Sequence, residues 1–529
     1  MKQSLTGPGT FDDRIGALVG GGIATNLAGG LKGVEKEALR VRPDGWLSDR
    51  PHPRLLGSAL TNRYITTDFS EALLEFVTPA FAQTWETLGF LCDIHRFTCE
   101  RLDDELLWPA SMPCRIPEDD AIPIAQYGTS NVGLMKTIYR RGLAHRYGRS
   151  MQTIAGVHFN YSVPEAFWPA WQELEKVRGD LGAFRSAGYF ALARNFRRLG
   201  WLVLYLFGAS PALCRSFAPA GSAGLESWDE TTLYAPYATS LRMSDLGYSN
   251  RTQAKINISL NSLDEYVRDL VAAITTPEPA FVRIGVKVDG EYRQLSANRL
   301  QIENEYYSPI RPKRTAYTGE RPTAALLRAG VEYVEIRSLD ISVFDPAGIN
   351  QNTMRFMEAF LLYCLLEDSP PFDDRGLDEA ASNQSRVARR GREPGLELER
   401  DGRAVRLVDW AGEIVARVRA VAELVDSATG GSDYVQAVEH QQRKIADPAA
   451  TPSARLLAAL EESGGGFFDL GLAAARNHRD YFLSLAPMNP ERQAQLEEEA
   501  RDSVRRQREI EAADRLSFEE YLARYFAGT

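Results

Sequence analysis

Up to about residue 375, the chain consists largely of short segments in which apolar and polar residues alternate, separated by helical patterns. Alternation with a period of two is typical of a strand that buries one face. Segments 281–288 and 291–295 flank Asp289-Gly290, a pair typical of a tight turn. We expect these two segments to form an antiparallel hairpin. The alternating pattern predicts strands at residues 34–41, 73–77, 154–163, 256–260, 300–307 and 333–339.

Apolar residues at helical spacing predict helices over residues 84–107 and 354–366 in this part of the chain. Past residue 375 the strand-like patterns nearly disappear, and helices are expected at residues 404–427, 454–462 and 493–525. Strands and helices do not alternate as a regular βαβ repeat would require. The predicted fold class is therefore α+β with an antiparallel sheet.

Pro370 and Pro371 end the helix pattern that precedes them, and a polar stretch follows. Because prolines stop a helix and polar residues connect elements, we expect a division of the chain here. The expected parts are an N-terminal extension at 1–29, a core at 30–370, and a helical C-terminal part at 371–529 that packs on the core.

Composition places the chain among ordinary globular proteins, since 44% of its 529 residues are hydrophobic and 25% are charged. A net charge of −10 argues against the basic surface that nucleic acids bind. The longest apolar runs fall far short of the ~20 residues that cross a bilayer, and the first residues lack the apolar stretch of a secretory signal. We expect a cytoplasmic protein with no nucleic-acid or membrane partner, and nothing in the sequence requires more than a monomer.

The five cysteines are odd in number, widely spread and without CxxC spacing. This pattern is typical of reduced thiols, so neither a disulfide framework nor a zinc finger is expected. Cys92, His95 and Cys99 fall on one face of the predicted helix at 84–107 and resemble a metal site. The leucines that surround them indicate a core instead.

Four predicted strands carry polar side chains within apolar surroundings. Glu35 and Glu37 are two residues apart, so they share a face on a strand, whereas on a helix they would lie about 200° apart. The strand interpretation therefore matters for function. The polar positions on the other three strands are Glu75, the pair His158 and Asn160, and the pair Glu335 and Arg337.

Each of these signals alone has an unremarkable explanation. An acid pair can face solvent, Glu335 and Arg337 can form a structural ion pair, and His158 can be a core histidine. Several carboxylates that converge without a cation would repel one another and raise each other's pKa. Carboxylates and one imidazole suit Mg²⁺ or Mn²⁺, so the whole set predicts a site for divalent cations.

Nine segments carry a resemblance to a known family. Several are six or more residues long, and together they span most of residues 30–366, so chance is not a serious alternative. In this order they resemble the proteobacterial family of glutamate–cysteine ligases, also called γ-glutamylcysteine synthetases. The segments are GVEKEALRV, TDFSEALLEFVTP, WPASMPC, AQYGTSN, MQTIAGVHFNYS, YLFGASPA, YATSLRMSDLGY, QIENEYYSPIRPKR and EYVEIRSLD.

The resemblance implies a fold like that of glutamine synthetase. In that fold a curved antiparallel sheet forms a funnel closed by helices, with ATP and the amino acids entering from opposite ends. It also implies the reaction of L-glutamate, L-cysteine and ATP to γ-glutamylcysteine, ADP and phosphate, which begins glutathione synthesis. Residues 30–370 would then be the catalytic core, with Mg²⁺ as cofactor and Mn²⁺ as an alternative.

By motif position, the resemblance implies roles for single residues. Arg337 would contact the transferring phosphoryl group, and Arg242 the side-chain carboxylate of glutamate or its acyl phosphate. Asn160 would lie in the same substrate region. The aromatic wall around cysteine would be Phe69, Tyr139, Tyr248 and Tyr307, and the metal ligands would be Glu35, Glu37, Glu75, His158 and Glu335.

Two alternatives stay open at this point. A γ-glutamyl ligase that uses another amine would keep the metal and arginine positions and differ in the acceptor pocket. A catalytically silent relative that binds glutamate or nucleotide as a regulator is expected to have lost some of these positions. None of the matched site positions is substituted, which argues against the silent relative.

Overall fold

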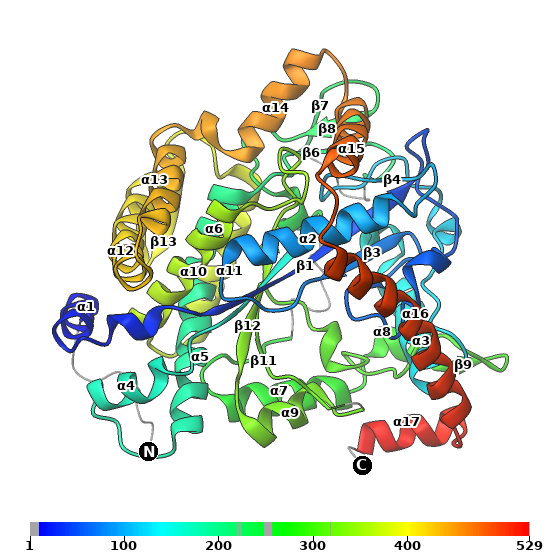
Figure 1. Cartoon of the computed structure of the whole chain (residues 1–529), viewed down its shortest axis with the longest axis horizontal. Coiled ribbons are helices and arrows are strands. Elements are labelled where there is room, and N and C mark those ends of the chain that lie inside the picture. The colour runs from blue at the N-terminus through cyan, green and yellow to red at the C-terminus, as the bar shows by residue number, and fades with distance from the viewer. Residues whose placement is uncertain (1–9, 219–221, 223, 248–255, 318, 528–529) are drawn as a thin grey trace.

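A seven-stranded antiparallel sheet lies in the middle of the molecule, surrounded by helices (Figure 1). The computed structural model describes residues 10–527 except 219–221, 223, 248–255 and 318, so Tyr248 lies outside the described residues. The strand order is β11-β12-β5-β1-β3-β2, and β4 pairs with β1. The strands are β1 (Leu31–Val41), β2 (Ile65–Thr67), β3 (Leu73–Val77), β4 (Leu106–Leu107), β5 (Val157–Ser162), β11 (Ile310–Lys313) and β12 (Tyr333–Leu339).

Ten helices are described before residue 370, and the central one is α10. Eleven consecutive residues of α10, from Phe356 to its end, are buried, as in a helix enclosed on all sides. The side chain of Asn350 caps its start by accepting a hydrogen bond from the backbone N–H of Thr353. The ten are α1 (Phe11–Gly20), α2 (Thr84–Cys99), α3 (Asn131–Tyr147), α4 (Phe167–Leu174), α5 (Leu181–Leu199), α6 (Trp201–Phe207), α7 (Leu263–Thr275), α8 (Pro279–Ile284), α9 (Pro322–Ala329) and α10 (Gln351–Leu366).

The part after residue 370 is mainly helical, and its α12 and α13 pack on α10. Within the described residues, no helix has both the length and the apolar character needed to cross a membrane. The helices are α11 (Asp374–Arg390), α12 (Leu407–Thr429), α13 (Asp433–Ala446), α14 (Pro452–Ser463), α15 (Phe467–Ser484), α16 (Pro490–Ala513) and α17 (Phe518–Ala527).

Short strands and 3₁₀ turns complete the described structure. Three small sheets lie outside the main one. They contain β6 (Ala212–Cys214), β7 (Glu226–Ser227) and β8 (Thr232–Tyr234); β9 (Lys287–Val288) and β10 (Glu291–Tyr292); and β13 (Glu397–Arg400) and β14 (Arg403–Arg406). The 3₁₀ turns are η1 (Ala24–Leu27), η2 (Arg54–Leu56), η3 (Asp119–Ala121), η4 (Ser150–Thr153), η5 (Leu241–Met243), η7 (Glu303–Glu305) and η8 (Pro448–Ala450).

The main sheet has one largely apolar face, and α2 and α10 lie against it. Phe76 on β3 packs edge-on against the ring of His95 on α2, with the ring centres 4.7 Å apart. The ammonium group of Lys32 on β1 reaches a carboxylate oxygen of Glu358 on α10 at 2.8 Å, and both side chains are buried. Because successive side chains of a strand point to opposite faces, the residues between these positions face away from the helices.

The α+β class and the strands predicted at 34–41, 73–77 and 333–339 are confirmed, and the strand predicted at 154–163 is shorter. Two predicted strands were wrong. Residues 256–260 have no regular structure, and 300–307 contain only the short turn η7. In that turn Glu303 and Glu305 are buried, and they form ion pairs with Arg321 and Arg146, respectively. The alternation of these acids therefore reflects two buried ion pairs, not the face of a strand.

Several predicted boundaries also required correction. The turn at Asp289-Gly290 is present, but the first predicted strand of the hairpin begins inside the helix α8, so only two residues pair on each side. The helix predicted over 84–107 ends at Cys99, and the segment 106–107 forms β4. The helix expected from residue 404 starts at Leu407, after β14, and the one expected over 493–525 is divided into α16 and α17.

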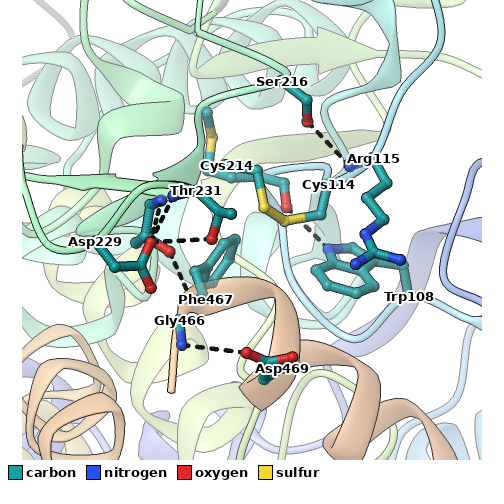
Figure 2. The surroundings of a disulfide bond; sticks show 12 residues. Trp108, Cys114, Arg115, Cys214, Ser216, Asp229, Thr231, Gly466, Phe467 and Asp469 are labelled. Carbon is teal, nitrogen blue, oxygen red and sulfur yellow. Dashed lines mark hydrogen bonds between the residues drawn. A yellow bond between two sulfur atoms is a disulfide. The ribbon is translucent and has the colours of Figure 1, made fainter. Parts of the chain in front are cut away.

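The expectation that all cysteines are free thiols was wrong for one pair. Cys114 and Cys214 form a disulfide, with their Cα atoms 5.2 Å apart (Figure 2). The two residues are separated by 100 positions in the sequence, so spacing could not reveal them. Nearby, the backbone N–H of Arg115 donates to the hydroxyl of Ser216 at 3.1 Å, which joins the same two loops. Cys92, Cys99 and Cys364 are free.

The charged helix α16 fastens the C-terminal part to the core. Its exposed side carries pairs such as Arg505 with Glu509, whereas Glu499 and Ser503 are buried against the core. Both carboxylate oxygens of Glu499 accept hydrogen bonds from Arg63, one from the backbone and one from the guanidinium group. The charge-rich helix α16 therefore has one side that packs on the core and one side that faces solvent.

We predict that Glu499→Gln destabilises the protein by about 1.5 to 3 kcal/mol, the range for hydrogen bonds to charged groups. The variant loses the charge that holds Arg63 and Arg506. Thermal unfolding of the purified protein measures the effect. Glu498→Gln, an exposed neighbour on the same helix, should unfold like the unmodified protein, and equal stability of both variants would contradict the docking role.

Candidate active site

The register of the main sheet places the predicted polar residues side by side. Glu35 on β1 lies directly opposite His158 on β5. On its other edge, β1 pairs with β3 so that Glu37 lies opposite Glu75. Residues paired across antiparallel strands point to the same face, so the four side chains share the face that α2 and α10 leave uncovered.

The neighbouring strands extend this row. Glu335 on β12 lies opposite Asn160 on β5, and Arg311 on β11 lies opposite Glu335. The row borders a cavity of about 520 Å³, within the usual size of small-molecule sites. Its lining includes Glu35, Glu37, Asp68, Glu75, Lys136, Tyr139, Arg140, Arg146, Gln152, His158, Tyr307, Arg311, Lys313, Glu335 and Arg337.

Glu335 is the acid of this cluster with the most cationic neighbours. Its oxygens lie 3.1 Å from Arg337, 3.2 Å from the ammonium group of Lys313 and 3.9 Å from Arg311. Burial alone would raise the pKa of Glu335, but these three cations outweigh burial and hold the pKa well below its usual range. Glu335 therefore stays ionised in the cavity.

Glu75 has the opposite electrostatic environment. Burial raises its pKa well above the usual range, and repulsion from Glu35, Asp68 and Glu37 adds to the effect. Burial also raises the pKa of Glu37, one oxygen of which accepts the backbone N–H of Gly156 at 2.6 Å. This side of the cluster carries an excess of carboxylate.

Three of the predicted metal ligands form a group that fits a divalent cation. Glu35, Glu75 and His158 each offer one ligand atom, and these atoms lie within 4.8 Å of one another. Nδ1 of His158 is 3.1 Å from Glu35, and the amide of Asn160 donates to the other oxygen of Glu35 at 2.9 Å. Two carboxylates and an imidazole are ligands that Mg²⁺ and Mn²⁺ accept, and a cation would relieve the repulsion around Glu75.

The predicted substrate residues are distributed unevenly. Tyr139 and Tyr307 line the cavity, whereas Phe69 is buried in the hydrophobic core and is absent from the cavity lining. Arg242 is buried behind the cavity wall, where its guanidinium group donates to the backbone oxygen of Arg337 at 2.9 Å. Tyr248 lies outside the described residues.

Sequence reasoning missed the basic side of the cavity. Lys136 and Arg140 come from α3, and Arg311 and Lys313 from β11. Burial lowers the pKa of Lys136 to about 8. The alternation of Arg311 and Lys313 within IRPKR was a signal that could have found the β11 pair, because i and i+2 share a strand face.

Helix α3 is held in place by the C-terminal helices. Leu522 of α17 packs in a small apolar cluster with Met135 and Ile138 of α3. At the start of α3, the backbone N–H of Asn131 donates to the carboxylate of Asp514, which directly follows α16. The C-terminal part therefore supports a helix that lines the cavity.

The residues Cys92, His95 and Cys99 belong to the core of the other sheet face. His95 is buried, and its Nε2 lies 2.8 Å from the ammonium group of Lys36 on β1. Burial raises the pKa of both thiols to about 11. Two protonated thiols beside an ammonium group are poor metal ligands, so the expectation of a core is confirmed.

A family model described as glutamate-cysteine ligase matches residues 18–387. The chain belongs to the glutamate–cysteine ligase family. A glutamate–cysteine ligase of Alcanivorax borkumensis is 52% identical over 521 residues, covering 98% of this chain and 99% of the relative. One of Pseudomonas putida is 49% identical over 497 residues, 94% of each chain.

Two solved structures resemble the present one. A glutamate–cysteine ligase from Francisella tularensis, in complex with AMP, superposes with a TM-score of 0.89 at 37% identity, covering 94% of this chain and 98% of that one. A bifunctional glutathione synthetase from Pasteurella multocida has a TM-score of 0.67 at 24% identity, covering 88% of this chain and 53% of that one, and shows a shared fold.

We predict that Glu75→Gln leaves the metal-free protein at least as stable as the unmodified one, because the substitution removes a carboxylate that burial and three acids disfavour. The variant should lose most of the stabilisation that Mg²⁺ gives the unmodified protein. Thermal unfolding in EDTA and in a MgCl₂ titration measures both effects. Glu118→Gln, at an exposed position, is the matched control, and a Glu75→Gln variant that retains the full Mg²⁺ response would contradict the assignment.

Proposed function

We propose that this chain joins the γ-carboxylate of L-glutamate to the amino group of L-cysteine. ATP is the co-substrate, and the products are γ-glutamylcysteine, ADP and phosphate. This is the first step of glutathione synthesis. One observation carries the proposal: a row of paired strand residues gathers carboxylates, an imidazole and Arg337 on one cavity in a chain of the glutamate–cysteine ligase family.

Mg²⁺ is the proposed cofactor, with Mn²⁺ as the alternative. Glu35, Glu75 and His158 would hold it, and Glu37 and Glu335 lie beside them as further candidate ligands. When bound, the cation supplies positive charge that offsets the phosphates of ATP. The AMP in the Francisella relative supports the use of an adenine nucleotide.

The first chemical step brings anions together. An oxygen of the γ-carboxylate attacks the γ-phosphorus of ATP, the bond to ADP breaks, and γ-glutamyl phosphate forms. Arg337 lines the cavity and is paired with Glu335, so its guanidinium group is fixed where it can neutralise the transferring phosphoryl group. Arg242, bound to the backbone of Arg337, supplies a second positive charge for the γ-carboxylate or its acyl phosphate.

The second step forms the amide. The amine of cysteine attacks the acyl carbon, phosphate leaves, and the nitrogen gives up a proton. The enzyme needs no nucleophile of its own, so neither the free cysteines nor the Cys114–Cys214 pair has a chemical role here. Asn160 holds Glu35 through its amide at 2.9 Å and belongs to the same substrate region.

The sheet that gathers these groups is proposed to form the wall of a funnel of the glutamine synthetase type, within a catalytic core at 30–370. The part at 371–529 supports that core from outside, as the contacts of α16 and α17 with the core indicate. Substrates would then enter the funnel from its two ends.

We predict that Arg337→Lys lowers the turnover number at least ~10²-fold, the order seen when one transition-state donor is removed. Lysine keeps the charge but loses the planar fork that can bind phosphoryl oxygens in pairs. Steady-state ADP release measures the change. A normal turnover number with only a weaker KM for glutamate would place Arg337 outside the chemical step.

We predict an acceptor order of cysteine, then 2-aminobutyrate, then alanine and serine, with ammonia nearly inactive. Aromatic side chains of Tyr139 and Tyr307 line the cavity, and they favour a thiol, which behaves as a small hydrophobe, over a hydroxyl group. Burying the hydroxyl of serine without a good partner costs about 1 to 3 kcal/mol. ADP release with each amine at fixed glutamate and Mg²⁺ gives the order.

A substitution at Tyr307 tests where this pocket lies. Tyr307→Ala should flatten the preference for cysteine over serine, whereas Tyr317→Ala, at an exposed ring, should leave it unchanged. An unchanged preference in Tyr307→Ala would move the pocket elsewhere. Ammonia as good as cysteine would replace the proposed reaction by a glutamine synthetase-like one, and no ADP release with any amine would favour a silent relative.

A further inference from the structure

Asp340 is a buried acid that none of the roles above uses. It directly follows β12, the strand that carries Glu335 and Arg337, and its carboxylate is fully inaccessible to solvent. A buried carboxylate is costly unless hydrogen bonds and a cation compensate it. The contacts of Asp340 therefore indicate what it does.

A β-bulge in β12 sets the direction of this side chain. Ile336 lies opposite Phe159 on β5, but Leu339 lies opposite Val157, so β12 contains one residue more than β5 between the two pairs. Without this extra residue, Leu339 would share the polar face of Glu335 and Arg337. The bulge turns Leu339 to the apolar face, and Asp340 follows it directly where the strand ends.

Three groups from two other loops bind the carboxylate of Asp340. One oxygen accepts the backbone N–H of Ala209 at 2.8 Å and the hydroxyl of Ser210 at 2.6 Å. The other oxygen accepts the hydroxyl of Ser240 at 2.9 Å. Asp340 thus ties the loop after α6 and the start of η5 to the end of β12.

The cation that compensates Asp340 is Arg242, the middle residue of η5. Its guanidinium group is buried and lies 3.6 Å from the same oxygen that binds Ser240. A Cβ atom at Gly156 would come within 2.0 Å of this guanidinium group, so glycine leaves the space that it fills. Arg242 also donates to the backbone oxygen of Arg337.

The guanidinium group of Arg242 therefore lies against the backbone of Arg337, and each arginine has its own carboxylate. Glu335 pairs with Arg337 at 3.1 Å, and Asp340 pairs with Arg242. Removing the carboxylate of Asp340 would leave the buried guanidinium group of Arg242 without this partner.

We propose that Asp340 is a positioning residue: held by the hydroxyls of Ser210 and Ser240, its carboxylate fixes the guanidinium group of Arg242 behind the cavity wall, against the backbone of Arg337. This inference rests on the proposed function, in which Arg242 supplies positive charge for the γ-carboxylate or its acyl phosphate.

A double-mutant cycle of Asp340→Asn and Arg242→Lys tests the inference. Asp340→Asn alone should lower kcat about 10- to 100-fold, the loss typical when an orienting partner is removed, and should keep the KM for ATP and the Mg²⁺-dependent rise in Tm. In the Arg242→Lys background, the same substitution should lower kcat by no more than about twofold further. A merely structural Asp340 would give losses that multiply, and that result would overturn the inference.

Glu499→Gln is the control for stability, because it should lower Tm while leaving kcat of the folded protein unchanged. If Asp340→Asn does not fold, Ser210→Ala takes its place, since it removes one hydrogen bond from Asp340 and keeps the charge. It should cause a smaller loss of kcat that disappears in the Arg242→Lys background, and an equal loss in both backgrounds would overturn the inference.

The cycle also separates this inference from the proposed function. A normal kcat for Arg242→Lys would remove the role proposed for Arg242 and the inference with it. A slow Arg242→Lys together with a normal Asp340→Asn would leave the role of Arg242 intact and overturn the inference alone.

Discussion

The antiparallel pairing of β1 with β5 and β3 is the constraint on which the site depends. It puts Glu35 opposite His158 and Glu37 opposite Glu75, so carboxylates that repel one another lie side by side. A shift of either pairing by one residue would move a whole set of side chains to the face covered by α2 and α10. Burial of the largely apolar face therefore determines the strand register, and the register determines which side chains meet in the site.

Charge is arranged unequally within the cavity. Glu335 has Arg337, Lys313 and Arg311 around it and stays ionised, whereas Glu75 faces mainly other acids and has a raised pKa. One end of the row is therefore neutralised by the protein itself. The other end has the donor set for a divalent cation. A cation bound there would compensate the carboxylates that the protein itself leaves without enough positive charge.

Segments outside the main sheet support the residues that line the cavity. The pairing of Asp340 with Arg242 ties two loops to the end of β12. Helices α16 and α17 brace α3, which supplies Lys136 and Arg140 to the cavity. The C-terminal part thus acts on the site through the elements that it supports.

The sequence alone determined the strands that carry chemistry, because alternation with a period of two both marks a strand and assigns Glu35 and Glu37 to one face. Its motifs also identified the family. Three features depend on residues that are far apart in the sequence and close in space, so only the tertiary structure decided them. They are the pairing of Cys114 with Cys214, the burial of Phe69 in the core, and the basic residues that α3 and β11 contribute to the cavity. Local pattern also failed at 300–307, where buried acids bind distant arginines, because an ion pair depends on what the fold brings near and not on neighbours in the chain.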